Sequence, residues 1–121
     1  MAPFSRIDHI QLAMPAGEEA KARAFYTGVL GLEEMPKPPE LAARGGAWFR
    51  SGTVMLHLGV DPSFRPATKA HPAFRCAEFA ALVERLREHD VEVVADANTF
   101  EGSEHCYIAD PFGNRIELIE G

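Results

Sequence analysis

Apolar and polar side chains alternate over residues 6–14, near the start of the chain. Ile10, Leu12 and Met14 fall on one side of this stretch, and His9 falls on the other. Side chains of a β-strand point alternately to its two faces. The alternation therefore predicts a strand with one face in the core and His9 on the opposite face.

The periodicity changes to that of a helix over residues 18–29. Ala20, Ala24, Phe25 and Val29 recur at helical spacing and are predicted to face inward. The stretch begins with two acidic residues, which the helix dipole favours in a first turn, and a glycine that suits a helix end follows it. We therefore predict one helix here.

Short apolar runs predict three more strands in the first half of the chain, at residues 32–35, 47–50 and 53–60. Residues 36–46 are rich in proline and end in two glycines, so we predict a loop there. Residues 61–69 contain further prolines and are predicted to form a linker.

The second half of the chain repeats the same order of elements. The predicted elements are a strand at 70–76, a helix at 78–89, and strands at 91–95, 104–109 and 115–120. The helix has apolar residues at positions i, i+3, i+4 and i+7, so it is amphipathic. Because the order β-α-β-β-β occurs twice, the predicted fold class is α+β, with two tandem βαβββ modules.

The size of the chain fits this arrangement. It has 121 residues, of which 46% are hydrophobic and 25% are charged, values typical of a globular protein. We expect a single domain over residues 1–121, with a first module at about 5–60, the linker at 61–69 and a second module at about 70–121. Each module alone would be marginally stable, so the two should share a core.

The net charge is −6, and this narrows the choice of partners. A surface that binds nucleic acid or an anionic membrane needs clustered Lys and Arg, so we expect neither partner. No stretch reaches the ~20 apolar residues of a membrane span, and the N-terminus lacks a basic and then apolar signal region. We therefore expect a cytoplasmic protein whose two cysteines, Cys76 and Cys106, are reduced and buried.

Four potential metal ligands recur with nearly the same spacing in the two halves. His71 follows His9 by 62 positions, and Glu117 follows His57 by 60. Each of them alternates with the apolar residues of its predicted strand, so each lies on the face that the strand does not give to the core. We predict that curved strands bring the four groups together in a cup.

The chemistry of these side chains suits a divalent metal ion. Neutral imidazole and carboxylate groups bind Fe, Zn, Ni and Mn, so one of these is the expected cofactor. Three or four protein ligands leave open positions for water or a substrate oxygen. His105 is a competing ligand candidate because it alternates with Tyr107, although nothing in the first half mirrors it. His89, at a predicted helix end, is expected to be solvated.

Three motifs resemble those of the glyoxalase / bleomycin-resistance / dioxygenase proteins, the vicinal oxygen chelate superfamily. The family's helix-end motif resembles Phe25-Tyr26-Thr27-Gly28-Val29-Leu30-Gly31-Leu32. Its last-hairpin motif resembles Asp110-Pro111-Phe112-Gly113-Asn114-Arg115-Ile116-Glu117, and its opening strand resembles Ile7-Asp8-His9-Ile10. The motifs stand in the family's order and together cover nearly the whole chain.

The resemblance implies the glyoxalase-like fold, in which two βαβββ modules form a curved mixed-sheet cup around a metal ion. It implies that His9 and His57 of the first module and His71 and Glu117 of the second are the metal ligands, and that the turn at 110–114 aims the last strand. It also implies a homodimer in which each cup draws on both chains. His57 departs from the glyoxalase I-like members, which usually carry a carboxylate or amide there.

The expected function is that of a metal-dependent enzyme, either a lyase or isomerase or a dioxygenase. Its small substrate would chelate the metal through vicinal oxygens. Glu117 is the catalytic candidate for moving a proton, and Tyr107, Arg115 and Trp48 are candidates for binding the substrate. One alternative is a metal-free protein of the bleomycin-resistance type that sequesters a drug or another small ligand. The third is a thiol transferase of the fosfomycin-resistance type, in which Arg75 and Arg115 would hold a phosphonate.

Overall fold

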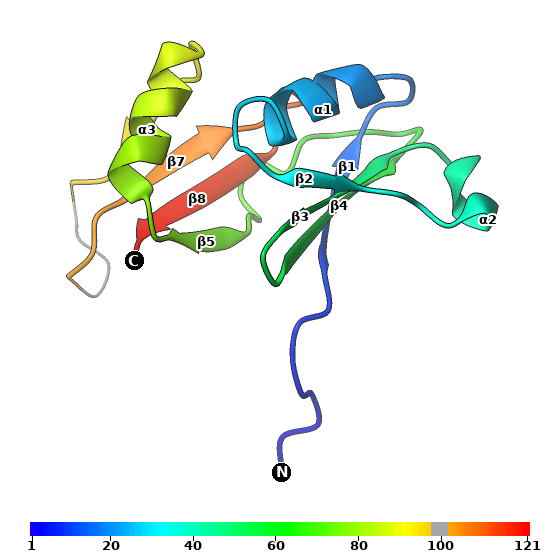
Figure 1. The fold of residues 1–121 in the computed structure, drawn as a ribbon, viewed down its shortest axis with the longest axis horizontal. Coiled ribbons are helices and arrows are strands. Elements are labelled where there is room, and N and C mark those ends of the chain that lie inside the picture. The colour runs from blue at the N-terminus through cyan, green and yellow to red at the C-terminus, as the bar shows by residue number, and fades with distance from the viewer. Residues whose placement is uncertain (98–101) are drawn as a thin grey trace.

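The computed structural model describes residues 1–97 and 102–121, and its elements follow the order β-α-β-β-β in each half, with one additional short helix (Figure 1). The first half contains β1 (Ile10–Met14), α1 (Glu19–Tyr26), β2 (Glu33–Met35), α2 (Pro39–Ala42), β3 (Ala47–Ser51) and β4 (Val54–Val60). The second half contains β5 (Ala73–Cys76), α3 (Phe79–Glu88), β6 (Val94–Ala95), β7 (His105–Ala109) and β8 (Arg115–Glu120). The predicted α+β class and the two βαβββ modules are confirmed.

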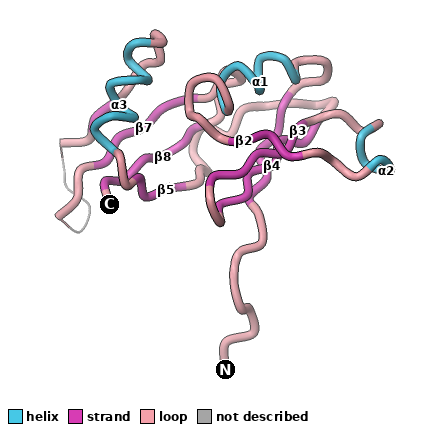
Figure 2. The backbone as a smooth tube through the Cα atoms, viewed as in Figure 1, coloured by secondary structure: helices cyan, strands magenta, loops and turns pink. Residues whose placement is uncertain are grey.

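Each module forms its own four-stranded mixed sheet, visible as two groups of strands in Figure 2. The strand order is β1-β4-β3-β2 in the first sheet and β5-β8-β7-β6 in the second. In both sheets the first strand of the module pairs in parallel with the last strand, and the other pairs are antiparallel. As a result β1 and β5 are edge strands, and within the described residues no strand pairs with their outer edges.

The first helix ends earlier than predicted, and its buried face is different. It stops at Tyr26, and turns continue the chain to Gly31, which has the left-handed φ of 79° that suits a helix end. The prediction that Ala20 and Ala24 face inward is wrong, because both are exposed. The buried stripe consists of Ala22, Phe25, Tyr26 and Val29, at positions i, i+3, i+4 and i+7, so the prediction is confirmed at Phe25 and Val29.

Four other segments differ from the sequence-based prediction. The first strand starts at Ile10 rather than residue 6, and β5 starts at Ala73 rather than residue 70. Both β1 and β5 are edge strands, each with only one neighbouring strand. In front of β5, Pro72 has no backbone N–H to donate to the sheet, which helps to explain the later start. The predicted loop at 36–46 contains the helix α2, and the predicted strand at 91–95 is reduced to Val94–Ala95. The segment between the strands predicted at 91–95 and 104–109 lies largely outside the described residues.

The core lies between the sheets and the two longer helices. The helix α1 contacts β3, and α3 contacts β5 and β8, so both helices lie on the same side of the strands (Figure 1). The predicted inward face of α3 is confirmed at Phe79, Val83 and Leu86, which are all buried. None of the helices among the described residues is both long and apolar enough to cross a membrane.

The cysteines are free thiols, as predicted. Cys106 is buried in the core, whereas Cys76 is only half-buried. Burial raises the pKa of both thiols. Both side chains therefore favour the uncharged thiol form, which is the form expected of packing residues rather than nucleophiles.

A buried polar network joins the two modules. The Tyr26 hydroxyl donates a 2.7 Å hydrogen bond to Asp110 Oδ2, and Asn114 Nδ2 donates to the same oxygen and to the carbonyl of Ala13 at the end of β1. The backbone N–H groups of Phe112 and Asn114 donate to Asp110 Oδ1. The turn before β8 is therefore fixed to α1 and β1, in agreement with the structural role predicted for residues 110–114.

Candidate metal centre

The first pair of candidate ligands forms part of a stack of three rings. His57 lies on β4 directly opposite Trp48 on β3, and the two rings are parallel within 7° with centroids 4.1 Å apart. The His9 ring stacks on the other side of His57 at 4.2 Å. His57 is only 7% exposed, and this burial, together with the nearby His9, lowers its pKa. The neutral imidazole, which is the form that binds metals, is thereby favoured at His57.

The second pair of candidate ligands is in direct contact. His71 Nε2 lies 3.0 Å from Glu117 Oε1, and His105 Nδ1 lies 2.9 Å from Glu117 Oε2. Glu117 and His105 are each 8% exposed. His105 Nε2 in turn lies 3.6 Å from Asp96 Oδ2. The carboxylate of Glu117 is therefore buried between two imidazoles, one from the segment before β5 and one from β7.

His9 and His71 hold corresponding places just before the first strand of each module. The prediction that they lie within strands is wrong, because both precede strands that start later than expected. Each nevertheless has its Nδ1 beside an oxygen: His9 Nδ1 lies 2.9 Å from the carboxylate of Asp8, and His71 Nδ1 lies 2.8 Å from the carbonyl of Lys69. In both modules this contact favours protonation of Nδ1 and leaves Nε2 as the nitrogen that can bind a metal.

The two sheets place equivalent residues in equivalent positions. Glu117 on β8 lies opposite Tyr107 on β7, just as His57 on β4 lies opposite Trp48 on β3. An aromatic ring therefore flanks the candidate ligand on the last strand of both modules. The two modules are therefore equivalent in the pairing of their strands as well as in the sequence spacing of the candidate ligands.

The two pairs do not combine into one centre within a single chain. Among residues 1–97 and 102–121, no group of three or more His, Cys, Asp or Glu side chains is arranged to hold a metal ion. Residues of β1 and of the segment before β5, His71 among them, line one pocket of about 370 Å³. Each module therefore presents half of the predicted ligand set.

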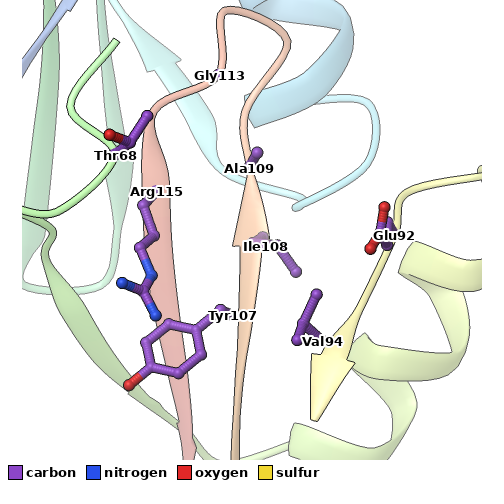
Figure 3. A pocket seen from close by; sticks show the side chains of 8 residues that line it. All are labelled: Thr68, Glu92, Val94, Tyr107, Ile108, Ala109, Gly113 and Arg115. Atoms are coloured by element: carbon purple, nitrogen blue, oxygen red, sulfur yellow. The ribbon is translucent and has the colours of Figure 1, made fainter.

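The candidate substrate-binding residues are divided between the two sheets. Trp48 belongs to the ring stack of the first sheet, whereas Tyr107 and Arg115 line a pocket of about 340 Å³ on the second sheet (Figure 3). The guanidinium carbon of Arg115 lies 3.8 Å from the centroid of the Tyr107 ring, a cation–π contact. Tyr107 also makes edge contacts with the rings of His71 and His105.

His105 is the residue whose place in the site was underestimated from the sequence. It has no counterpart in the first module, so the repeat could not indicate it. The available signal was its alternation with Tyr107, combined with the antiparallel hairpin that puts Tyr107 opposite Glu117. That geometry places His105 diagonally across from Glu117, within reach of its side chain.

Solved structures of related proteins have the same fold. A glyoxalase family protein from Bacillus anthracis is 43% identical, with 100% of this chain and 98% of that chain covered and a TM-score of 0.94. A lactoylglutathione lyase from Agrobacterium tumefaciens is 29% identical, with 99% and 96% covered and a TM-score of 0.71. An antibiotic binding protein from a Streptomyces species shares the fold at 21% identity, with 99% and 98% covered and a TM-score of 0.74.

The family comparison agrees with the fold and the motifs. No curated protein is similar enough to this chain to count as a match. The family model of the Glyoxalase/Bleomycin resistance protein/Dioxygenase superfamily matches residues 6–118, which include the whole of both modules except the last two residues of β8. The chain therefore belongs to the glyoxalase/bleomycin resistance protein/dioxygenase superfamily.

Proposed function

We propose that the protein is a metal-dependent enzyme acting on a small substrate that chelates the metal through vicinal oxygens. The observation that carries the proposal is the environment of His71. Its Nδ1 faces the Lys69 carbonyl at 2.8 Å, and its Nε2 faces Glu117 at 3.0 Å, so both ring nitrogens face oxygen acceptors. A neutral imidazole has one N–H and satisfies only one of them. A cation beside Nε2 would satisfy the other.

The donor atoms fit a divalent ion. Two donors that bind one ion at about 2.1 Å lie about 3 Å apart, which is the separation between His71 Nε2 and Glu117 Oε1. Imidazole and carboxylate are borderline-hard ligands that accept Fe, Zn, Ni or Mn. The Lys69 carbonyl on His71 and the Asp8 carboxylate on His9 provide the outer hydrogen bonds that orient metal-binding histidines.

We further propose that a second copy of the chain completes the site. The ring stack with His9 and His57 and the His71–Glu117 pair lie on different sheets, whose edge strands β1 and β5 have free outer edges in the described residues. Residues 1–9 extend away from the sheets (Figure 1), and Met1, Phe4 and Ile7 are exposed apolar residues along this arm. Free strand edges and an exposed apolar arm favour association with another copy, here as a symmetric homodimer.

In such a dimer, His9 and His57 of one chain face His71 and Glu117 of the other. When bound, the metal supplies Lewis-acid stabilisation of negative charge on a substrate oxygen. Glu117 accepts or returns a proton at the substrate carbon, and His105 Nδ1 holds the Oε2 atom of that carboxylate in place. The 29% identity to a lactoylglutathione lyase favours lyase or isomerase chemistry over oxygen-dependent cleavage.

The first test is direct titration of purified, chelator-treated protein with Zn²⁺ and Mn²⁺ by calorimetry. We expect one site per chain, and we expect Glu117→Gln and His71→Ala to lower the affinity at least 10-fold, as loss of a ligand should. His89→Ala is the matched control, because His89 is an exposed histidine at the end of α3. Wild-type protein that binds neither ion would contradict the proposal.

The second test determines whether the site lies between chains. His9→Ala and Glu117→Gln homodimers are mixed, exchanged and assayed for metal binding. If each site uses two chains, the hybrid dimer has one intact site, formed by the unaltered His9 and His57 of one chain and His71 and Glu117 of the other. If each site is formed within one chain, the hybrid has none. A homodimer of the double variant, which carries both substitutions in each chain, has no intact site under either arrangement and gives the background level of metal binding.

A second candidate function is metal-free sequestration of a flat ligand, as in a bleomycin-resistance type of protein. The parallel stack of Trp48, His57 and His9 favours it, because such rings stack on planar molecules. An antibiotic binding protein shares the fold. Tight binding of an aromatic drug that is unchanged by chelators and by His71→Ala would support this function against the first.

A further inference from the structure

Arg115 is a half-buried cation on the same strand as Glu117, two residues before it. Its guanidinium contacts the face of the Tyr107 ring at 3.8 Å. Within the described parts of the chain, no carboxylate lies within ion-pair distance of it. A guanidinium has five N–H donors, a ring face occupies none of them, and no side-chain hydrogen bond of Arg115 is formed within the described residues. Arg115 is therefore available to an anion that enters the pocket.

The first module provides an informative contrast. Arg50 on β3 pairs with Met55 on β4. The equivalent pair in the second module is Ala109 on β7 and Arg115 on β8. Arg50 donates to Glu33 Oε2 on the neighbouring strand β2 at 2.9 Å, so its charge is already compensated. The two modules thus each carry an arginine at this level of the sheet, but only Arg115 lacks such a partner among the described residues.

Tyr107 holds the arginine in a defined place. Its ring contacts Arg115 by its face and is flanked by His71 and His105, with centroid distances of 5.6 and 5.8 Å. It lies opposite Glu117 in the β7–β8 ladder. The platform under the guanidinium is therefore fixed by the same side chains that surround Glu117, which links the position of the cation to the candidate metal ligands.

The pocket around Arg115 has one positive charge. Its volume is about 340 Å³, and of the residues that line it only Arg115 is a cation. The one lining carboxylate, Glu92, lies on the other side of β7 from Arg115, whereas Thr68 lies above the guanidinium (Figure 3). A single guanidinium matches a planar, singly charged carboxylate, which it can bind through two parallel hydrogen bonds. A doubly charged phosphonate would call for more than one cation.

We propose that Arg115 and Tyr107 form a carboxylate subsite, so that the substrates are small organic acids. This inference rests on the proposed metal-dependent function, because it places the carboxylate relative to the chelating oxygens. Arg115 and Glu117 are two residues apart on β8 and therefore project from the same face of the sheet, so the carboxylate binds on the face that carries Glu117. The substrate therefore carries its vicinal oxygens at one end and a separate carboxylate at the other.

The test compares 3,4-dihydroxybenzoate with its methyl ester, which have the same adjacent hydroxyls but differ in the carboxylate. Dissociation constants are measured by calorimetry with zinc-loaded and with chelator-treated protein. We expect the acid to bind about tenfold more tightly than the ester, as one charge-assisted pair allows. In Arg115→Gln this ratio should fall to about one, whereas Arg115→Lys and Tyr107→Phe should retain a preference for the acid. Arg50→Gln is the matched control and should leave the ratio unchanged.

The outcomes separate this inference from the function on which it rests. Equal binding of acid and ester by the wild-type protein, or a ratio that Arg115→Gln leaves unchanged, would overturn the carboxylate subsite. If the affinity of each probe is the same with and without zinc, the metal-dependent function fails. The ratio of the acid's affinity to the ester's affinity still tests the carboxylate subsite in that case. A misfolded variant would bind neither probe, so ester binding that Arg115→Gln retains shows that this variant is folded, and the preference that Arg115→Lys keeps assigns the lost ratio to the charge.

Discussion

The hydroxyl of Tyr26 makes the contact between modules that is best suited to a quantitative test. Tyr26 is wholly buried in α1, and its hydroxyl donates to Asp110, which precedes the turn before β8. Burial and the adjacent carboxylate raise the pKa of Tyr26 far above its usual range, so the hydroxyl remains a donor at every pH at which the protein folds. The substitution Tyr26→Phe removes this donor and keeps the ring.

The structure sets the size of the expected effect. A buried hydrogen bond to a charged group contributes about 1.5–3 kcal/mol. Asp110 keeps three other donors in the variant, from the backbone N–H groups of Phe112 and Asn114 and from the Asn114 side chain. The carboxylate is therefore not left unsatisfied, and we expect a loss of about 2 kcal/mol in the free energy of unfolding, in the lower part of that range.

Urea unfolding followed by circular dichroism measures this loss. With a slope of about 1.5 kcal/mol per molar urea, a loss of about 2 kcal/mol lowers the midpoint by about 1.3 M. Tyr107→Phe is the matched control, because its ring is half-buried and its hydroxyl has no hydrogen-bond partner among the described residues; we expect a change below about 0.5 kcal/mol. All samples need the same protein concentration, since the proposed dimer would make the stability depend on concentration. A Tyr26→Phe midpoint equal to that of Tyr107→Phe would refute the reasoning.

Two further predictions concern contacts that hold loops to the helices. The Gly46 N–H donates to Glu19 Oε2 at 2.8 Å and lowers the pKa of Glu19 below its usual 4.5, so this contact stabilises the fold above that pH and is lost as pH falls. Glu19→Gln should therefore lower the thermal midpoint at pH 7, and the difference should shrink between pH 5 and 3. Arg85 donates to the carbonyls of Val29 and Gly28, and Arg85→Ala should cost about 1 kcal/mol in urea unfolding, against little for the nearby exposed Arg87→Ala.

The fold could be predicted because its signals are local and repeated. The i, i+3, i+4, i+7 pattern of α3 and the alternation of β8 depend on the residues of each element alone, and both elements were predicted within one residue of their ends. The incorrect predictions concern strand ends, which depend on pairing with another strand. Residues 6–9 alternate like a strand, yet β1 begins at Ile10, which is where its pairing with β4 begins.

The site was only partly predictable for a related reason. The spacing of His9, His57, His71 and Glu117 indicates which positions correspond, and the strand register agrees with it for His57 and Glu117. Spacing carries no information on how two sheets are oriented, so it could not show that the ligands form two separate pairs. His105 also required tertiary knowledge, since its role follows from the hairpin that brings it to Glu117.

The way the modules are joined bears on how the site can be completed. Tyr26, Asp110 and Asn114 connect α1 and the end of β1 to the turn before β8 through side chains, without pairing β1 to β5. Had the modules joined through those strands, both edges would be used and the chain would need no second copy. Because the polar network does the joining, the edges stay open to a partner. If the proposed site between two chains holds, metal binding and dimerisation would share one set of contacts, and each would strengthen the other by the same free energy.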